Sequence, residues 1–192
     1  MIKKVAIYCS SSDALEPIYF SETIDLCEKL ALQKYNLVWG GCAVGLMKTV
    51  ADTFKKNNAK VFGFLPESLK DKNISYEDAD ELTYTKNLQE RKMMMESQSD
   101  ALIVLPGGFG TLEEALEVLT AKQLKFHTKP IIIYNTNNFY DPLLELFNKM
   151  YTEKVAKIEY KNLYFVTSQA EEVMTYLQNY KPYVLPNKWF EK

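Results

Sequence analysis

Short apolar runs alternate with longer segments of helical spacing along most of the 192-residue chain. The apolar runs have the length of buried strands and comprise residues 5–9, 37–39, 60–65, 82–85, 101–105, 130–134 and 163–166. The longer segments predict helices over residues 16–34, 44–57, 87–99, 112–124, 141–151 and 170–180. Strands that alternate with helices form βαβ units, so the sequence predicts an α/β fold: a Rossmann-like, three-layer parallel sheet with helices on both faces.

Length and charge narrow the class of protein further. A chain of 192 residues predicts a single domain, residues 1–192. The net charge of −2 offers no basic surface for nucleic acid, and no window approaches the ~20 apolar residues of a membrane span. The cysteines Cys9, Cys27 and Cys42 show no CxxC spacing, which indicates a reducing compartment and no cysteine metal site. We therefore expect a cytoplasmic protein with no nucleic-acid or membrane partner.

Three of the predicted strands end in turns that suit a ligand. Ligands of parallel sheets bind at the carboxyl ends of strands. Glycine lets backbone N–H groups approach an anion, and the helix behind the turn adds unpaired donors and the positive end of its dipole. The three turns consist of Ser10, Ser11 and Ser12, of Gly40, Gly41 and Gly45, and of Gly107, Gly108 and Gly110 followed by the hydroxyl of Thr111.

Each of these turns also has a purely structural explanation. A tight strand-to-helix turn needs glycine whether or not a ligand binds there. Neither glycine-rich turn is a Walker A loop, because no Gly-Lys-Ser/Thr follows. Three such turns at three strand ends nevertheless favour a site for a nucleotide or a sugar phosphate.

Two acids begin the predicted helix that follows the third turn. Thr111 and Glu114 have the spacing of a capping box, in which Thr111 is the N-cap and Glu114 reaches back from the third helical position. Glu113 would be favourable near the positive end of the helix dipole. The residues alone favour this capping role, and catalysis is the alternative because the acids would lie beside the anion pocket.

The preceding predicted helix carries an Arg91-Lys92 pair directly before Met93, Met94 and Met95. Arginine is suited to two-pronged contact with phosphate or carboxylate, whereas a solvated pair on a helix surface is the alternative. Three consecutive methionines cannot all face one way on a helix, so at least one is expected at a pocket or an interface.

Residues 90–114, ERKMMMESQSDALIVLPGGFGTLEE, resemble the signature of the Lonely Guy family, the cytokinin riboside 5′-monophosphate phosphoribohydrolases. That signature is an Arg-Lys pair, a strand and a PGGxGTxxE motif. GGCAVGLM is similar to the family's GGGxxGLMG turn, YCSSS to its CGSS turn, and QLKFHTKP to its QLGxHxKP segment. Ser10, Cys42, Lys48 and Lys125 stand where the family usually has glycine. Some relatives are labelled lysine decarboxylases, but no lysine here lies in a recognisable pyridoxal-binding context.

The resemblance implies a hydrolase that cleaves the N-glycosidic bond of nucleoside 5′-monophosphates, either AMP or an N6-modified AMP such as a cytokinin riboside monophosphate. It implies catalytic roles for Arg91 and Glu114, no metal or organic cofactor, and a homodimer. The substrate-binding residues that it implies are Ser11, Ser12, Gly41, Gly45, Glu67, Lys92, Gly107, Gly108, Phe109, Gly110, Thr111, Leu112, Glu113 and Thr120. Physically, a carboxylate beside the ribose stabilises the positive charge that develops as the bond breaks.

A non-catalytic nucleotide or molybdenum-cofactor carrier is the alternative function, because carriers of related folds use similar glycine turns. A pure carrier would not need the combination of Arg91 and Glu114.

The remaining polar residues are interpreted as structural. His127 is the only histidine and makes a poor metal site by itself, and Asp100 is expected to cap a helix end or a loop. No base is visible that would make a nucleophile of Cys9 or Cys42. Residues 69–80 are expected to form an irregular loop, and the tail, residues 181–192, to pack on the body or on a partner.

Overall fold

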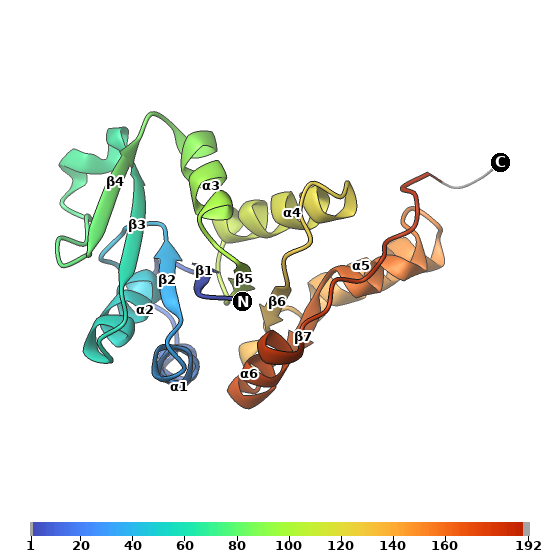
Figure 1. The fold of residues 1–192 in the computed structure, drawn as a ribbon, viewed down its shortest axis with the longest axis horizontal. Coiled ribbons are helices and arrows are strands. Elements are labelled where there is room, and N and C mark those ends of the chain that lie inside the picture. The colour runs from blue at the N-terminus through green and yellow to red at the C-terminus, as the bar shows by residue number, and fades with distance from the viewer. Residues whose placement is uncertain (1, 190–192) are drawn as a thin grey trace.

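All seven strands of the computed structural model, which describes residues 2–189, lie in one parallel sheet (Figure 1). The strands are β1 (Lys4–Tyr8), β2 (Asn36–Trp39), β3 (Val61–Pro66), β4 (Glu81–Thr85), β5 (Ala101–Val104), β6 (Ile131–Tyr134) and β7 (Phe165–Thr167). Their order in the sheet is β4-β3-β2-β1-β5-β6-β7, and every neighbouring pair is parallel. The predicted α/β fold with a Rossmann-like parallel sheet is confirmed.

Helices cover both faces of this sheet (Figure 1). They are α1 (Pro17–Leu32), α2 (Gly45–Lys56), α3 (Leu88–Ser97), α4 (Phe109–Gln123), α5 (Asp141–Thr152) and α6 (Ala170–Asn179). One core layer takes Leu26 of α1, Val50 of α2 and Val173 of α6, whereas the other takes Met95 of α3 and Val118 of α4. The protein therefore has three layers, with α1, α2 and α6 on one side and α3, α4 and α5 on the other.

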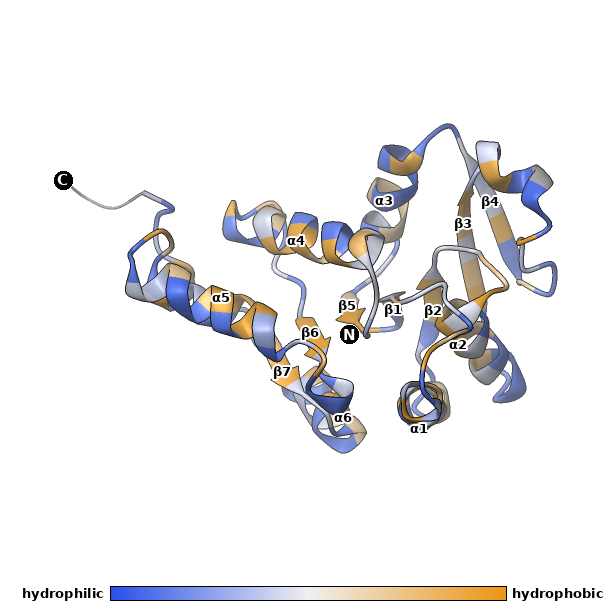
Figure 2. Cartoon of the chain, turned by 180° about the vertical axis from the view of Figure 1, so that it is seen from behind, coloured by the Kyte–Doolittle hydropathy of each residue, from blue (hydrophilic) through white to orange (hydrophobic). Residues whose placement is uncertain are grey.

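The central strands are apolar throughout because both of their faces are covered. Every residue of β5 and of β6 is buried, and Figure 2 shows hydrophobic residues concentrated along these strands. The edge strand β4 is instead largely exposed or half-buried. None of the helices within residues 2–189 is long and apolar enough to cross a bilayer.

The order of the strands reverses beside β1, and this reversal positions the candidate site. The chain builds outward from β1 through β2 and β3 to β4, and it then returns to place β5 on the other side of β1. Loops that leave the carboxyl ends of β1 and β5 therefore diverge to opposite sides of the sheet, which opens a crevice at that edge.

Most predicted elements form within a few residues of the expected bounds, and three regions differ. The last strand, β7, begins at Phe165 because residues Ile158–Leu163 form a 3-10 helix, η3. The expected irregular loop, residues 69–80, begins inside another 3-10 helix, η1 (Glu67–Lys72). Helix α4 begins at Phe109, inside the expected turn, which changes the roles of the residues at its start.

The tail packs on the body of the protein in part. Leu185 is buried in the core layer beneath α3, α4 and α5, and the Tyr160 hydroxyl donates a hydrogen bond to the Asn187 carbonyl at 3.4 Å. Trp189 is 71% exposed, and Phe190 lies outside the described residues.

A buried tyrosine holds the carboxyl end of β5 in place. Its hydroxyl, that of Tyr140, donates to the Leu105 carbonyl at 2.7 Å. We predict that Tyr140→Phe lowers the free energy of unfolding by about 1–3 kcal/mol, because the carbonyl loses its partner while buried. Urea denaturation measures the change. Tyr19→Phe is the control and should change stability by less than about 0.5 kcal/mol, since Tyr19 is only half-buried. Equal effects of the two substitutions would contradict the assigned role of the Tyr140 hydroxyl.

Candidate active site

A cavity of about 540 Å³ lies at the carboxyl ends of β1 and β5, where the strand order reverses. It brings together eight of the residues that the sequence analysis singled out, namely Ser11, Ser12, Arg91, Gly108, Phe109, Gly110, Thr111 and Glu114. Ser10, which the sequence analysis placed in the serine turn, lines the cavity as well, together with Cys9 and Met47, which were not predicted as site residues. Their signal in the sequence is their position, because each lies in one of the motifs that contain predicted residues.

The first wall of the cavity is the serine turn after β1. The Ser10 N–H donates to the Pro106 carbonyl at 3.1 Å, which joins this turn to the one that follows β5. The Ser12 N–H donates to the Ser10 hydroxyl oxygen at 3.1 Å, so local hydrogen bonds hold the turn. Ser11 and Ser12 are exposed and line the cavity, and the Ser12 hydroxyl oxygen also accepts from the Ala14 N–H at 3.2 Å.

The second wall is the N-terminus of α4. The N-cap is Gly108, and no side chain caps the helix. The first backbone N–H groups of a helix have no partner within it, so those of Phe109, Gly110 and Thr111 are available to an anion. Leu112 is the first residue to continue the helix, donating to the Gly108 carbonyl at 3.0 Å.

The predicted capping box is wrong. Thr111 lies within the first turn of α4 rather than at its N-cap, and Glu114 points to another helix. The Thr111 hydroxyl instead fills the space beside Gly107, where an added Cβ would lie 2.1 Å from the Thr111 oxygen. Gly107 is therefore required by packing against Thr111.

The third wall is an ion pair between α3 and α4. Arg91 Nη1 donates to Glu114 Oε1 at 2.5 Å, and the two side chains are only 12% and 9% exposed. Arg91 Nε also donates to the Phe64 carbonyl at 3.0 Å, which fixes the guanidinium against the end of β3. An acid in the second turn of α4 and an arginine on α3 thus form one largely desolvated unit at the cavity.

Burial and the ion pair shift the pKa of Glu114 in opposite directions. Loss of hydration raises the pKa of the Glu114 carboxyl, and the neighbouring Arg91 charge lowers it. The burial effect is the larger, so the pKa lies above the ordinary value of 4.5. Burial likewise raises the pKa of the Cys9 thiol, which is consistent with the expectation that Cys9 is no nucleophile.

Gly40 makes room for the arginine. A Cβ added at Gly40 would lie 1.9 Å from Arg91 Nη2 and 2.4 Å from Met47 Cε. The glycine was predicted as part of an anion-binding turn, but its visible role is to let the guanidinium approach the backbone after β2.

The rest of the second glycine turn is occupied by the protein itself. The Gly45 N–H, at the start of α2, donates to Asp13 Oδ1 at 2.9 Å, so an acid of this chain already holds that helix terminus. Gly45 has φ +53°, and an added Cβ would lie 2.6 Å from the backbone of Ser11 and Ser12. Gly41, with φ +74°, is also buried. Neither Gly41 nor Gly45 lines the cavity, and the turn serves to pack closely against the serine turn.

Gly107 and five of the other predicted substrate residues also lie outside the cavity. Lys92 forms ion pairs with Glu113 and with Glu117, whose Oε2 lies 2.5 Å from Lys92 Nζ. This lysine therefore links α3 to α4. Leu112 packs against the core layer on that side of the sheet. Thr120 lies at a separate cavity of about 140 Å³ between α4 and α5.

The last of these predicted residues, Glu67, is exposed at the start of η1 after β3. It too does not line the cavity.

His127 has the structural role expected of it. Its Nε2 lies 3.0 Å from the Val118 carbonyl, and its Nδ1 accepts from the Lys129 N–H at 3.2 Å. Burial lowers the pKa of the imidazole, so it is neutral, with the proton on Nε2.

Asp100 binds the start of β1 rather than the end of a helix. Its carboxylate accepts from the N–H groups of Lys3 and Lys4 at 2.8 and 3.0 Å.

The three methionines of α3 face different ways, as predicted. Met95 is fully buried, Met94 packs on the core, and Met93 is 63% exposed. Within residues 2–189, no cluster of three or more His, Cys, Asp or Glu side chains could hold a metal ion.

The fold and the cavity together define a Rossmann-like protein with an uncapped helix terminus beside a buried arginine–glutamate pair. A family model described as "Possible lysine decarboxylase" matches residues 47–177. Cytokinin riboside 5′-monophosphate phosphoribohydrolase LOG5 from Arabidopsis thaliana is 35% identical over 180 residues, covering 94% of this chain and 79% of the relative. LOG2 from the same plant is 33% identical over 180 residues, covering 94% and 84%. The chain belongs to this Lonely Guy phosphoribohydrolase family.

Solved structures of lower identity share the fold. The molybdenum cofactor binding protein of Rippkaea orientalis superposes with a TM-score of 0.71 at 21% identity, covering 93% of this chain and 96% of the other. The molybdenum cofactor carrier protein of Chlamydomonas reinhardtii gives 0.69 at 17% identity, covering 93% and 97%.

The clearance at Gly40 generates a prediction about the electrostatics of the site. A methyl group in Gly40→Ala displaces the Arg91 guanidinium, which is the flexible end of its side chain, so the fold is kept. Because the arginine charge lowers the pKa of Glu114, its displacement should raise that pKa further, as measured by a carbon-detected NMR titration of the carboxyl group.

Gly108→Ala is the matched control, because a Cβ there meets nothing within 4 Å. It should leave the pKa of Glu114 close to that of the parent protein. An unchanged or lower pKa in Gly40→Ala would show that Gly40 does not set the position of Arg91.

Proposed function

We propose that this protein hydrolyses the N-glycosidic bond of nucleoside 5′-monophosphates, AMP or N6-modified AMP of the cytokinin riboside type, to a free base and ribose 5-phosphate. The observation that carries the proposal is the buried Arg91–Glu114 pair in the same cavity as the uncapped terminus of α4. One part of the cavity suits a phosphate, and the other suits a sugar that acquires positive charge. The names of the relatives, which describe phosphoribohydrolases of cytokinin riboside monophosphates, support the same reaction.

The 5′-phosphate is proposed to bind at the start of α4. The free N–H groups of Phe109, Gly110 and Thr111 point along the helix axis, and the positive end of the dipole favours a dianion. The Ser11 and Ser12 hydroxyls lie on the opposite wall and can donate to the same phosphate or to the ribose. A phosphate fixed there orients the ribose at the neighbouring carboxylate, which favours the monophosphate over the free nucleoside.

Glu114 is proposed to act on the ribose. As the bond between C1′ and the base nitrogen breaks, positive charge grows on C1′ and the ring oxygen, and a carboxylate stabilises it mainly in the transition state. A water oxygen then bonds to C1′ and one of its protons passes to Glu114 as general base. The departing base nitrogen takes up a proton from solvent, and Glu114 returns its proton to solvent, so one water is consumed for each bond cleaved. Arg91 holds Glu114 in position and keeps more of it ionised. Activity should therefore fall as the pH drops through the raised pKa of Glu114.

A non-catalytic carrier is the second candidate function. It is favoured by the fold shared with molybdenum cofactor carrier and binding proteins, whose identity to this chain is 21% or lower. The buried Arg91–Glu114 pair favours the enzyme, because desolvating two charges is costly and a carrier gains nothing from it. Release of adenine from AMP by the protein distinguishes the two.

We also infer a cytoplasmic enzyme that works as a homodimer through the α3–α4 face. The free cysteines, all buried, suit a reducing compartment.

The proposed dimer interface is apolar. Large apolar side chains are exposed on and around α3 and α4: Leu88 at 59%, Met93 at 63%, Leu116 at 43% and Phe126 at 78%. A second copy would remove this surface from water. Thr120 and Glu113, which lie on α4 outside the cavity, would then be near the partner.

The catalytic proposal predicts the effects of two substitutions. Glu114→Gln should lower kcat for AMP by roughly 10²–10³-fold with little change in KM, because the lost charge acts mainly in the transition state. Arg91→Ala should lower kcat by at least roughly 10²-fold, since Glu114 loses its fixed position. Chromatographic detection of adenine measures both rates.

Glu117→Gln is the matched control on the same helix. Glu117 pairs with Lys92 and does not line the cavity, so turnover should stay within about twofold. Near-normal hydrolysis by Glu114→Gln would show that the catalytic assignment is wrong, and AMP binding without adenine release by the parent protein would favour the carrier.

The dimer proposal predicts a change of mass in solution. Met93→Glu places a charge in the proposed interface and should convert the dimer to a monomer in sedimentation velocity runs. Leu32→Glu, at a residue 67% exposed on α1 on the opposite face, should leave the dimer intact. A monomeric parent protein, or a dimer that Leu32→Glu disrupts and Met93→Glu does not, would refute an interface at α3 and α4.

A further inference from the structure

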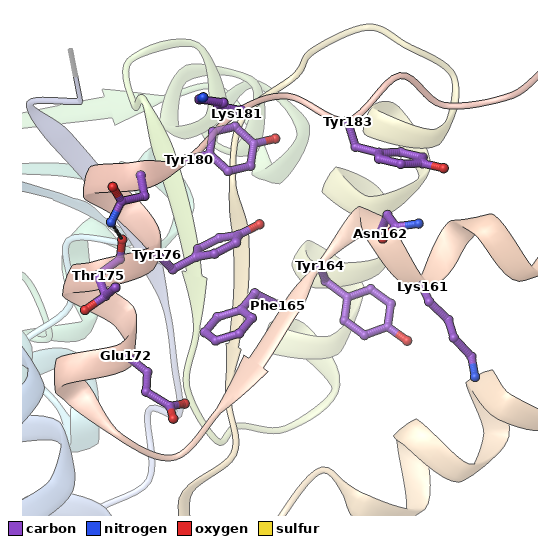
Figure 3. A pocket seen from close by; sticks show the side chains of 11 residues that line it. Lys161, Asn162, Tyr164, Phe165, Glu172, Thr175, Tyr176, Tyr180, Lys181 and Tyr183 are labelled. Atoms are coloured by element: carbon purple, nitrogen blue, oxygen red, sulfur yellow. Dashed lines mark hydrogen bonds between the residues drawn. The ribbon is translucent and has the colours of Figure 1, made fainter.

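A second large cavity lies at the β7 edge of the sheet, away from the candidate active site. It has a volume of about 640 Å³ and is formed by residues of η3, β7, α6 and the segment that follows α6 (Figure 3). The two cavities share no lining residue, and β7 lies two strands beyond β5 in the sheet. The volume falls within the range of about 300–1,000 Å³ that is usual for small-molecule sites.

Aromatic rings form both sides of this cleft. The rings of Phe165 and Tyr176 stack with centroids 4.5 Å apart at 15°, and Tyr180 meets Tyr176 edge-on at 5.5 Å. Figure 3 shows these rings on the α6 side, whereas Tyr164 and Tyr183 lie on the opposite side of the cleft. Several aromatic rings that line one cleft suit a flat ring, which gains ring contacts on binding.

Hydrogen bonds hold part of the wall in place before any ligand binds. The Tyr180 hydroxyl donates to the Thr128 carbonyl at 2.7 Å, and the hydroxyls of Tyr164 and Tyr151 lie 3.2 Å apart. A wall that is already ordered loses little conformational entropy on binding. Among the described residues, the Tyr176 and Tyr183 hydroxyls meet no hydrogen-bonding partner, so both remain available to a ligand.

The charges around the cleft favour an anion. Lys161 and Lys181 line it, together with a single acid, Glu172. The Glu172 carboxylate already accepts a hydrogen bond from the Thr167 hydroxyl at 2.5 Å. The cleft is therefore positive, although the chain as a whole carries a net charge of −2. Figure 3 shows both lysine side chains directed outward from the rings, and Lys161 Nζ lies 5.6 Å from the centroid of the Tyr151 ring. Positive side chains that border an aromatic cleft attract a ring that carries an acidic group.

We propose that this cleft is a second ligand site, specific for a small planar aromatic anion, a flat ring that carries a carboxylate or a phosphate. The ring packs against Tyr176, Tyr180 and Tyr183, and its acidic group pairs with Lys161 or Lys181. The site requires neither Glu114 nor Arg91, so it stands independently of the hydrolase proposal.

The test is a titration of the full chain followed by protein-observed NMR with four simple probes. Benzoate and phenyl phosphate carry both features, cyclohexanecarboxylate lacks the aromatic ring, and benzylamine carries the opposite charge. Benzoate or phenyl phosphate, or both, should shift the amide signals of Thr175, Tyr176 and Tyr183, and which of them binds more tightly identifies the acidic group. The dissociation constant should be about tenfold weaker for cyclohexanecarboxylate, and benzylamine should not bind.

Variants of exposed residues locate the binding. Tyr183→Ala should weaken the binding of benzoate by about threefold to tenfold, and Lys181→Ala by at least about twofold. Trp189→Ala and Lys188→Ala are the matched controls in the same segment, because neither residue lines the cleft, and they should leave binding unchanged. Glu114→Gln should also leave it unchanged.

Two outcomes would overturn the proposal. One is the absence of saturable shifts at the cleft with both aromatic anions. The other is binding that is insensitive to Tyr183→Ala, to Lys181→Ala and to the charge of the probe, which would describe a nonspecific apolar groove.

Discussion

The contact on which the site depends is the ion pair between Arg91 on α3 and Glu114 on α4. Placing two charges at side-chain exposures of 12% and 9% costs solvation, and the cost is offset only because each charge has a close partner. The Phe64 carbonyl takes a second donor of the guanidinium, and Gly40 leaves the space that the guanidinium occupies. The same desolvation raises the pKa of Glu114, so one arrangement positions the acid and sets its protonation.

The N-termini of α2 and α4, both at this edge of the sheet, differ in whether a side chain of the protein occupies them. The start of α2 is already held by the Asp13 carboxylate, whereas the start of α4 has no capping side chain and lines the cavity. Two glycine-rich turns with similar sequences thus have different roles. The Gly40–Gly45 turn packs against the serine turn and Arg91, and the Gly107–Gly110 turn leaves the first N–H groups of α4 without a partner in the helix. An anion bound at α4 lies beside the carboxylate, which is the geometry that the proposed hydrolysis requires.

Most of the fold could be predicted from the sequence, because buried parallel strands and amphipathic helices each leave a periodic pattern. Residues at the start of α4 could not be placed in this way. Thr111 and Glu114 have the spacing of a capping box, but the helix begins at Phe109 and the acid turns to an arginine 23 positions earlier in the chain. A local pattern says nothing about a partner on another helix. The role of Gly40 was hidden for the same reason, since its neighbour in space is Arg91 and its neighbours in sequence suggest an anion site.

The central claim is that a phosphate bound at the uncapped start of α4 delivers a ribose to Glu114. A crystal structure of Glu114→Gln soaked with AMP tests this most directly, because the substitution slows turnover and keeps the substrate intact. The account predicts the phosphorus within hydrogen-bonding reach of the N–H groups of Gly110 and Thr111, with C1′ facing the side chain at position 114. A phosphate at the Gly40–Gly45 turn, or a ribose that faces away from position 114, would contradict it.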